Sequence, residues 1–154
     1  MKETLTIRKA LADDVELLYK WSNDELVRKQ SFNSNKISFE THCKWFEGKL
    51  KDKKSLMYIV EVGSIPASVV RFDIAEENTV IGISISTDYR GKGLGGNSIK
   101  IGLEEYFLVN NLPVLASIKK DNIASIKSFE KAGFVFLKDE LINGVVSVIY
   151  QIER

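Results

Sequence analysis

A glycine-rich segment at residues 88–96 constrains the fold more than any other part of this sequence. Four of the six residues from Gly91 to Gly96 are glycine, and the segment lies between a strand-like stretch and a long helix-like one. Glycine allows consecutive backbone N–H groups to turn toward one ligand, and the N-terminus of the following helix adds partial positive charge. A phosphate or pyrophosphate fits such a loop. A plain turn at the helix entry is the alternative, although four glycines are costly in backbone entropy.

Hydrophobic periodicity divides the remaining sequence into strands and helices. Period-2 alternation and short apolar runs predict seven strands, at Thr4–Lys9, Leu56–Val62, Ala67–Ile74, Val80–Ser86, Val114–Ile118, Phe134–Lys138 and Val145–Ile152. Helical spacing and capping residues predict helices over Ala12–Ser22 and Glu25–Lys29, after Ser38, from the glycine-rich segment to about Val109, and from Asn122 to Gly133. The second to fourth strands are expected to be antiparallel neighbours, and Asn143-Gly144 predicts a type I′ hairpin turn. At 154 residues, we expect a single domain over residues 1–154.

Composition narrows the choice of partners and compartment. The chain has 22 Lys and Arg against 21 Asp and Glu, and a net charge of +1 is too small for non-specific binding of nucleic acid. Cys43 and His42 are the only cysteine and histidine, so we expect neither a disulfide nor a Cys/His metal cluster. No apolar run approaches the roughly 18 residues of a membrane span. We therefore expect a cytoplasmic protein with no metal, no nucleic-acid partner and no membrane partner.

Two well-known phosphate-binding loops fit the glycine-rich segment poorly. A Walker loop needs Gly-Lys followed by Ser or Thr, and the sequence contains no such string. Gly91, Gly93 and Gly96 match the dinucleotide pattern G-x-G-x-x-G, but residues 106–120 contain no Asp or Glu for a ribose. The match that remains is Arg90-x-x-Gly93-x-Gly95. It resembles the acetyl-CoA loop, Arg/Gln-x-x-Gly-x-Gly/Ala, of the Gcn5-related N-acetyltransferase (GNAT) family.

The resemblance to the GNAT family extends along essentially the whole chain. Residues 122–134 resemble its second conserved block, with Asn122 at the helix start and Gly133-Phe134 at the helix end, and the predicted order of elements is the family's order. The resemblance implies an α/β (α+β) fold with a mixed, mostly antiparallel seven-stranded sheet flanked by about four helices. It also implies an enzyme that transfers an acetyl group from acetyl-CoA, its co-substrate, to a primary amine.

The same resemblance implies where acetyl-CoA binds. The pyrophosphate would lie on the N–H groups of the loop, and the pantetheine arm would lie beside the preceding strand like an added strand. A backbone N–H of that strand would face the thioester oxygen. Asn122 is also a helix N-cap by its position, and the two roles are compatible. The implied cofactor-binding residues are Ile83, Ser84, Ile85, Arg90, Gly91, Lys92, Gly93, Leu94, Gly95, Gly96, Asn122, Ser125 and Phe129.

Two departures from the family pattern concern proton transfer. Members that acetylate ribosomal proteins carry a Glu five residues before the Asn, and many members carry a Tyr seven residues after it. Here these positions are Ser117 and Phe129, which argues against the ribosomal-protein type. A thiol with a pKa of about 8.5 leaves adequately as the thiolate without an acid, whereas an amine with a pKa of about 10 needs a base at neutral pH.

Strand residues supply the candidates for that base. Asp73 and Arg71 lie two residues apart and so share one face of a strand. Asp73 would order the amine or a water molecule, and a salt bridge between the two residues is the structural alternative. Ser84, through a bound water, is the second catalytic candidate. Glu61 is the third, with a solvated strand residue as its structural alternative.

Residues 21–33 and 37–46, together with Val70-Arg71-Phe72-Asp73, resemble one branch of the family. Members of this branch act in pseudaminic- and legionaminic-type sugar biosynthesis on nucleotide-linked 4-amino sugars. The likeness implies substrate-binding roles for Arg28, His42, Trp45, Phe46, Arg71 and Asp73. Core packing is the alternative for His42 and the aromatic residues, and a pair with Asp24 is the alternative for Arg28. The charged run Lys49–Lys54 is expected to be a solvated helix end without a function.

We expect a small-molecule amine as the acceptor, most specifically the 4-amino group of a UDP-linked amino sugar. Acetylation of peptides, proteins or other small amines is the alternative activity, because it would use the same cofactor loop. A non-catalytic acyl-CoA sensor is the alternative without catalysis. The final strand is expected to offer an edge through which a homodimer forms.

Overall fold

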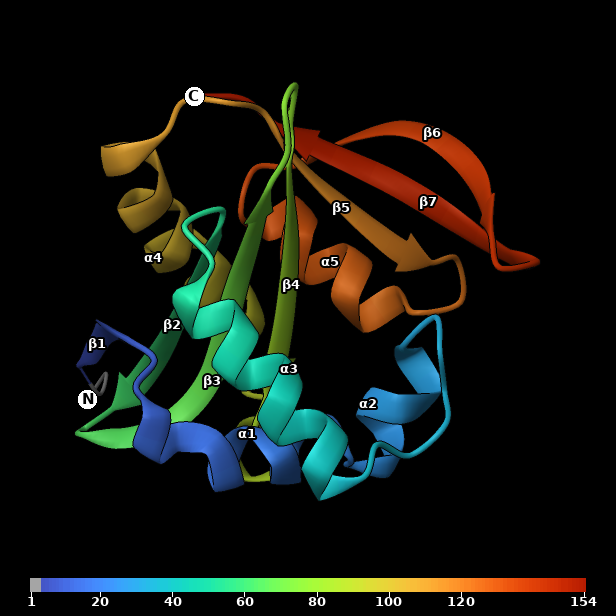
Figure 1. The fold of residues 1–154 in the computed structure, drawn as a ribbon. Helices are drawn as coiled ribbons and strands as arrows, with labels where there is room; N and C mark the ends of the chain where they lie inside the picture. Colours follow the sequence, from blue (N-terminus) through green and yellow to red (C-terminus); the bar gives the residue numbers. More distant parts are fainter. Residues whose placement is uncertain (1–3) are drawn as a thin grey trace.

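The predicted strands pair into one seven-stranded sheet in the computed structural model, which describes residues 4–154 (Figure 1). The strands are β1 (Leu5–Lys9), β2 (Ser55–Val62), β3 (Ile65–Ile74), β4 (Thr79–Ile85), β5 (Val114–Lys119), β6 (Val135–Ile142) and β7 (Val145–Ile152). Their spatial order is β1-β2-β3-β4-β5-β7-β6, and only β4 and β5 pair in parallel. The predicted mixed, mostly antiparallel sheet is confirmed. The predicted domain start at residue 1 lies outside the described residues.

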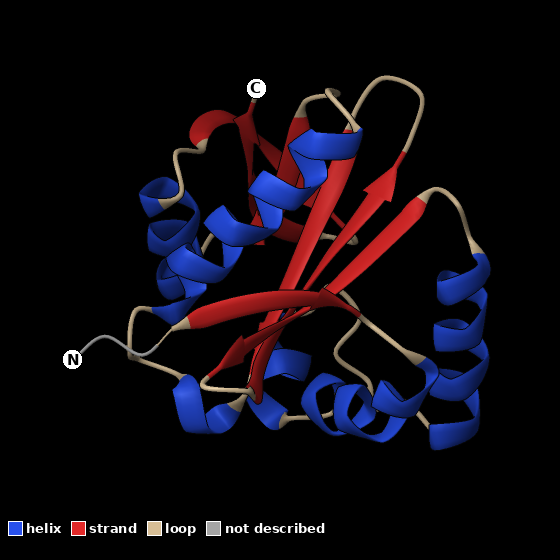
Figure 2. Ribbon diagram, turned by 90° about the vertical axis from the view of Figure 1, so that its left-hand side faces the viewer, coloured by secondary structure: helices blue, strands red, loops and turns tan. Residues whose placement is uncertain are grey.

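Helices cover both faces of the sheet (Figure 2). On one face lie α1 (Val15–Ser22) and α3 (Phe39–Lys51), with the short α2 (Glu25–Gln30) beside them. On the other face lie α4 (Leu94–Val109) and α5 (Ile123–Lys131). Between residues 4 and 154, no helix combines the length and the apolar character that a membrane crossing requires.

The start of the first predicted helix differs from the expectation. Residues Ala12–Asp14 form a 3-10 turn, and the α-helix begins only at Val15. The Asp14 carboxylate accepts the Leu11 N–H at 2.7 Å, and it also binds the Arg8 guanidinium at 2.8 and 2.9 Å. This side-chain cap tightens the first turn.

Alternate residues of the central strands face the two helical layers. Tyr58 and Val60 of β2 belong to the main core under α4, whereas Met57 and Ile59 belong to the cluster under α1 and α3. In β3, Val70 and Phe72 face α4 in the same way, so their neighbours Arg71 and Asp73 point to the face that α1 and α3 cover. The sheet thus presents a charged pair to the helical layer formed by the N-terminal third of the chain.

The final hairpin corrects one prediction. Asn143 and Gly144 both have positive φ, 50° and 77°, as a type I′ turn requires. Because this turn has only two residues, β6 extends to Ile142 instead of ending at Lys138. The prediction that the final strand offers a free edge is wrong, since β7 lies between β5 and β6. The more apolar β7 is buried over Ser147–Tyr150, and the exposed β6 forms the edge.

Candidate active site

Strand β4 has an opening on one side. It pairs with β5 only through Thr79 with Val114 and Val80 with Leu115, after which the two strands diverge (Figure 1). On its other side, β4 stays paired with β3 as far as Ile85. Alternate backbone groups of residues 81–85 therefore point into the gap without a β5 partner. The predicted cofactor residues Ile83, Ser84 and Ile85 lie along this gap.

The glycine-rich segment forms the turn at the end of this opening. A 3-10 turn (η2, Thr87–Tyr89) leads into it, and Gly91 and Gly93 have φ angles of 72° and 76°. Glycine adopts this left-handed region without strain. Helix α4 then starts at Leu94, so the free N–H groups of its first turn lie next to the loop. The geometry is that of an anion site built from backbone groups.

Gly95 and Gly96 serve a different purpose from the turn glycines. Both are buried in the first turn of α4, against α5. A Cβ on Gly95 would stand 2.6 Å from Ser128 Oγ, and one on Gly96 would stand 2.7 Å from Lys131 Cδ. These two glycines let α4 and α5 approach closely. Two of the four glycines in the segment are therefore explained by helix packing.

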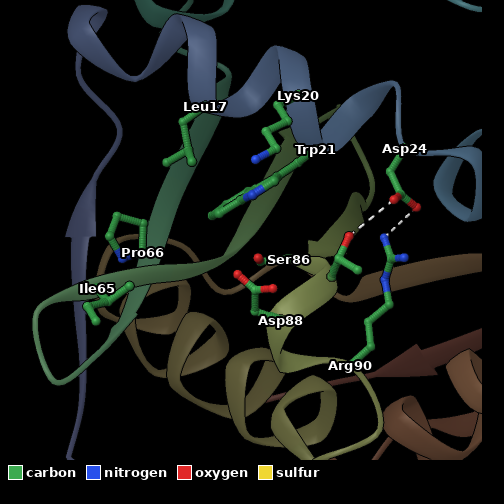
Figure 3. Close-up of a pocket in the computed structure, with 10 residues that line it drawn as sticks. Leu17, Lys20, Trp21, Asp24, Ile65, Pro66, Ser86, Asp88 and Arg90 are labelled. Carbon is green, nitrogen blue, oxygen red and sulfur yellow. Dashed lines mark hydrogen bonds and ion pairs between the residues drawn. The ribbon is translucent and has the colours of Figure 1, made fainter.

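A small cavity of about 260 Å³ lies beside the loop, between α1 and the end of β4 (Figure 3). Asp24 points from the end of α1 toward Arg90, and its carboxylate lies 2.7 Å from an Arg90 nitrogen. Thr87 Oγ1 donates to the same carboxylate at 3.2 Å. The hydrogen bond from Arg90 holds the pKa of Asp24 below its ordinary value against the opposing effect of burial. The Arg90 side chain thus links the glycine-rich segment to Asp24, the N-cap residue of α2.

The predicted residues of α5 lie on the other side of the loop. Asn122 Oδ1 accepts the Ser125 N–H at 3.2 Å, which is the expected N-cap, and Ser125 is half-buried. Phe129 is only 2% exposed and packs edge-to-face on Phe134 with ring centroids 5.0 Å apart. Phe129 is a core residue. It lacks the hydroxyl group that a tyrosine at this position would carry.

A second group of side chains gathers on the α3 face of β3 and β4. The Arg71 guanidinium carbon lies 5.1 Å from the ring centroid of Trp45, which is 37% exposed. Its Nη2 lies 3.5 Å from the point where a Cβ on Gly82 of β4 would stand. The missing side chain of Gly82 lets Arg71 lie across β4 toward the opening. Sequence reasoning missed Gly82, although its position opposite Arg71 in the strand register is visible once the strands are paired.

Asp73 connects Arg71 to helix α3. Its carboxylate accepts from Arg71 Nε at 3.0 Å and from Lys49 Nζ at 2.8 Å. Burial raises the pKa of Asp73, but the hydrogen bond from Lys49 and the charge of Arg71 outweigh burial and lower the pKa below the ordinary aspartate value. Asp73 is therefore ionised at neutral pH and is a weak base. The prediction that the run starting at Lys49 is a solvated helix end is wrong for Lys49 itself, whose ammonium group binds Asp73. Lys49 follows Trp45 by four residues, a spacing that puts both on one face of α3.

Two predicted substrate residues are buried, and a third, the half-buried Arg28, binds loop groups of the protein itself. His42 is 2% exposed, and its Nε2 lies 3.0 Å from the Val15 carbonyl oxygen. Phe46 is also 2% exposed and stacks on His42. Arg28 donates to the carbonyl oxygens of Ser22, Asn33 and Asn35 and to Ser31 Oγ at 2.7 to 3.1 Å. His42 and Phe46 are core residues, and Arg28 stabilises the loop between α2 and α3.

The catalytic candidates are not brought to one point. Asp73 is opposite Val80 on β4, and Ser84 lies four residues further along the same strand, about 13 Å away. Glu61 lies two strands from β4, with its Oε2 3.4 Å from Arg8 Nε. Residues 4–154 contain no group of three or more His, Cys, Asp or Glu able to hold a metal ion. Only Ser84 lines the gap between β4 and β5.

Comparison with known proteins identifies the fold and the family. The family model described as "Acetyltransferase (GNAT) domain" matches residues 4–135. The uncharacterized N-acetyltransferase YfmK of Bacillus subtilis (strain 168) is 26% identical over 121 residues, 79% of this chain and 78% of its own. Spermidine N-acetyltransferase from Vibrio cholerae, solved with CoA and spermine, has a TM-score of 0.86 at 19% identity and covers 97% of this chain and 95% of its own.

A second solved structure, AAC(6')-Ib in complex with ribostamycin and coenzyme A, has a TM-score of 0.85 at 16% identity. The match covers 99% of this chain and 94% of that chain. At these identities, the two structures show that the fold is shared. Because the family model matches most of the sequence, this chain belongs to the acetyltransferase (GNAT) domain family, and acetyl-CoA is its co-substrate.

Proposed function

We propose that this chain is a single N-acetyltransferase domain that transfers an acetyl group from acetyl-CoA to the 4-amino group of a UDP-linked amino sugar. The observation that carries the acceptor is the position of Arg71, between Trp45 and Gly82 at the opening beside β4. A cation and an aromatic ring at one site suit an acceptor that carries both phosphate and a flat base.

The cofactor would use backbone groups. Its pyrophosphate would accept hydrogen bonds from the N–H groups of residues 90–96, and its pantetheine amides would pair with β4 in the gap beside Ile83 and Ile85. The acetyl carbonyl would then receive an N–H from the same strand. This donor stabilises negative charge as it develops on the oxygen.

The transfer needs few side chains. The neutral amine attacks the thioester carbon, a C–N bond forms and the C–S bond breaks, and CoA leaves as the thiolate. The amine proton passes to a water molecule, for which Ser84 is the hydroxyl on the acceptor face of β4. Asp73 orients Arg71 and the acceptor rather than taking the proton, because its pKa is lowered.

Charge distinguishes this acceptor from those of the similar structures. Spermine and ribostamycin, named with those structures, are polycations. Here Lys49 and Arg71 place two positive charges against the single negative charge of Asp73 on the acceptor face. In the described part of the chain, Asp73 binds Arg71 through Nε alone, so the terminal nitrogens of Arg71 keep four N–H donors for an anion. A polycation would meet repulsion on this face.

The test is CoA release from acetyl-CoA with a matched set of acceptors. The set contains UDP-linked 4-amino sugars, the same amino sugars without the nucleotide, spermidine, an aminoglycoside and N-terminal peptides, with a no-acceptor control. Selective turnover of the nucleotide-linked sugars, at least tenfold above the free sugars, supports the proposal. Faster turnover of spermidine or peptides would assign the chain to those acceptors, and acetyl-CoA binding without turnover of any amine would indicate a sensor.

A further inference from the structure

Helix α2 has little packing of its own. It has six residues, none of them buried, and a helix of this length is not stable in isolation. The segment that contains it, residues 23–37, is closed on itself. Asn23 Nδ2 donates to the Ile37 carbonyl oxygen at 2.8 Å, and Asn23 Oδ1 accepts the Ile37 N–H at 2.8 Å. The place of α2 in the molecule therefore depends on the contacts that this segment makes with other elements.

Polar contacts at the two ends of α2 hold it to the two strands that flank the gap. At its start, Asp24 contacts Thr87 and Arg90, which follow the end of β4 (Figure 3). At its end, the Lys29 carbonyl oxygen accepts from Nζ of Lys119, the last residue of β5, at 2.7 Å. Helix α2 thus bridges the ends of β4 and β5 where these strands have diverged.

The link to β4 consists of one carboxylate with several partners. Asp24 Oδ1 lies 2.7 Å from Arg90 Nη2 and also accepts the Leu26 N–H of α2 at 3.1 Å, while Oδ2 accepts from Thr87 Oγ1 at 3.2 Å. The Asp24 and Arg90 side chains are each only 24% exposed, so water screens this ion pair less than a surface pair. Thr87 begins the 3-10 turn η2, and Arg90 directly follows it. Asp24 therefore holds both ends of the turn that leads into Gly91.

We propose that Asp24 is a positioning residue for the glycine-rich segment, and that it couples the binding of acetyl-CoA to the placement of α2. Glycine loses more backbone freedom on becoming ordered than any other residue, so a segment with four glycines is costly to order around a ligand. Fixing the turn before the segment lowers this cost in advance. The inference rests on the proposed pyrophosphate site and is independent of the acceptor.

The direction of the effect on binding separates ordering from simple electrostatics. Asp24 places a negative charge near the site proposed for an anionic pyrophosphate. If charge alone mattered, removing it would tighten the binding of acetyl-CoA. If Asp24 orders the segment, removing its charge weakens binding, because Thr87 and Arg90 lose their fixed partner.

Calorimetric titration with acetyl-CoA tests this inference through matched changes of aspartate to asparagine. Asp24→Asn keeps a good N-cap residue for α2 but removes the charge that pairs with Arg90. We expect the Kd for acetyl-CoA to rise about three- to tenfold. Asp13→Asn, at an exposed aspartate just before α1, is the control and leaves the Kd unchanged.

Hydrogen exchange, measured by mass spectrometry, gives a readout that a purely structural Asp24 does not move. In the wild type, saturating acetyl-CoA is expected to slow exchange of the N–H groups of α2 as well as those in the first turn of α4. In Asp24→Asn, also at saturating acetyl-CoA, the slowing in α4 is expected to remain and that in α2 to be lost.

Three results would overturn the proposal. They are an Asp24→Asn variant with the wild-type Kd, one with a lower Kd, and slowing of α2 exchange that is the same in both proteins. A cooperative thermal transition shows that Asp24→Asn is folded. Thr87→Val removes one contact to the same carboxylate without changing charge, and it is expected to raise the Kd about twofold.

Gly93→Asp separates this inference from the proposed cofactor site. If Gly93→Asp leaves acetyl-CoA binding unchanged, the pyrophosphate site and the role of Asp24 are both wrong. If Gly93→Asp weakens binding and Asp24→Asn does not, the site stands and only the role of Asp24 is wrong. None of these readouts requires an acceptor.

Discussion

The proposed cofactor side and the proposed acceptor side of β4 are built from different parts of the chain. On the proposed cofactor side, the groups that would bind are backbone groups, in the unpaired stretch at residues 81–85 and in the loop from Gly91 to Gly96. On the proposed acceptor side, they are side chains from three separate elements, α3, β3 and β4. A backbone site depends on local conformation. A side-chain site depends on which faces the helices turn inward after the whole chain has folded.

The largest expected effect comes from blocking the backbone site. Gly93→Asp adds a side chain and a negative charge where the pyrophosphate would lie, and like charges at close range cost several kcal/mol. We expect acetyl-CoA binding to weaken at least about a hundredfold, measured by calorimetric titration.

The matched control for this variant is Gly144→Asp. Gly144 has a φ of 77°, against 76° for Gly93, and both positions have open space around a new Cβ apart from Lys131 Nζ at 3.6 Å from Gly93. The two variants therefore impose the same backbone strain. Equal binding by both variants would show that the loop does not hold the cofactor. Gly95→Asp is unsuitable, because its Cβ would collide with Ser128.

The second prediction concerns the acceptor side. Arg71→Ala is expected to lower kcat/KM for the acceptor about 10- to 100-fold, because a hydrogen bond to a charged group contributes about 1.5–3 kcal/mol. The KM for acetyl-CoA is expected to stay within about twofold of the wild type. Lys51→Ala removes a charge from an exposed i,i+4 pair on the same helical layer and serves as the control. Equal losses in both variants would place Arg71 outside the acceptor site.

The third prediction, for Asp73→Asn, tests whether Asp73 orients Arg71 or accepts the proton of the amine. The change leaves Arg71 and Lys49 without their carboxylate, so we expect a loss of about three- to tenfold in kcat/KM. The pKa of Asp73 is already lowered, so the pH profile of kcat/KM between pH 6 and 9 is expected to keep its shape. If the rise of kcat/KM with pH that the wild type shows disappeared in Asp73→Asn, Asp73 would be assigned as the group that accepts the proton. Unchanged activity would leave Asp73 as a purely structural ion pair.

The same comparison explains which features could be predicted from the sequence. The seven strands, the two-residue turn at Asn143-Gly144 and the caps at Ser38 and Asn122 depend on local patterns, and their presence is confirmed, although β6 extends four residues beyond its predicted end. The loop could be located, but the packing role of Gly95 could not, because Ser128 lies 33 positions away.

The acceptor side shows what local patterns leave open. His42 and Phe46 share a helical face with apolar residues, and only the packing of α3 on α1 decides that this face is buried. Arg28 has nearby partners in sequence, but its guanidinium turns to loop carbonyl oxygens rather than to Asp24. Lys49 lies in a run of charges that resembles solvated surface, yet Asp73 of a distant strand binds it. Contacts with residues distant in sequence determined the outcomes for His42, Phe46 and Lys49, and the conformation of the loop after α2 determined that of Arg28.

The smallest expected effect tests whether His42 is a core residue. Burial lowers its pKa below the ordinary value near 6.5, and the contact with the Val15 carbonyl opposes this only in part. Below about pH 6.5 the unfolded chain binds a proton that the folded chain resists, so the free energy of unfolding falls as the pH drops through this window. The carboxylates with lowered pKa values, Asp14, Asp24 and Asp73, lose their contribution only at lower pH, below the unfolded value of 3.8.

Urea unfolding at pH 7.5 and pH 5.0 measures this effect. Between the two pH values, the free energy of unfolding is expected to fall more for the wild-type chain than for His42→Gln. Because His42 is the only histidine, its NMR signals also report directly whether ligand touches it. A core His42 keeps its pKa when a saturating acceptor is added, both in the wild type and in Arg71→Ala, in which acceptor binding is weakened. A His42 pKa that shifts with acceptor in the wild type, and not in Arg71→Ala, would extend the acceptor site into the layer between α1 and α3.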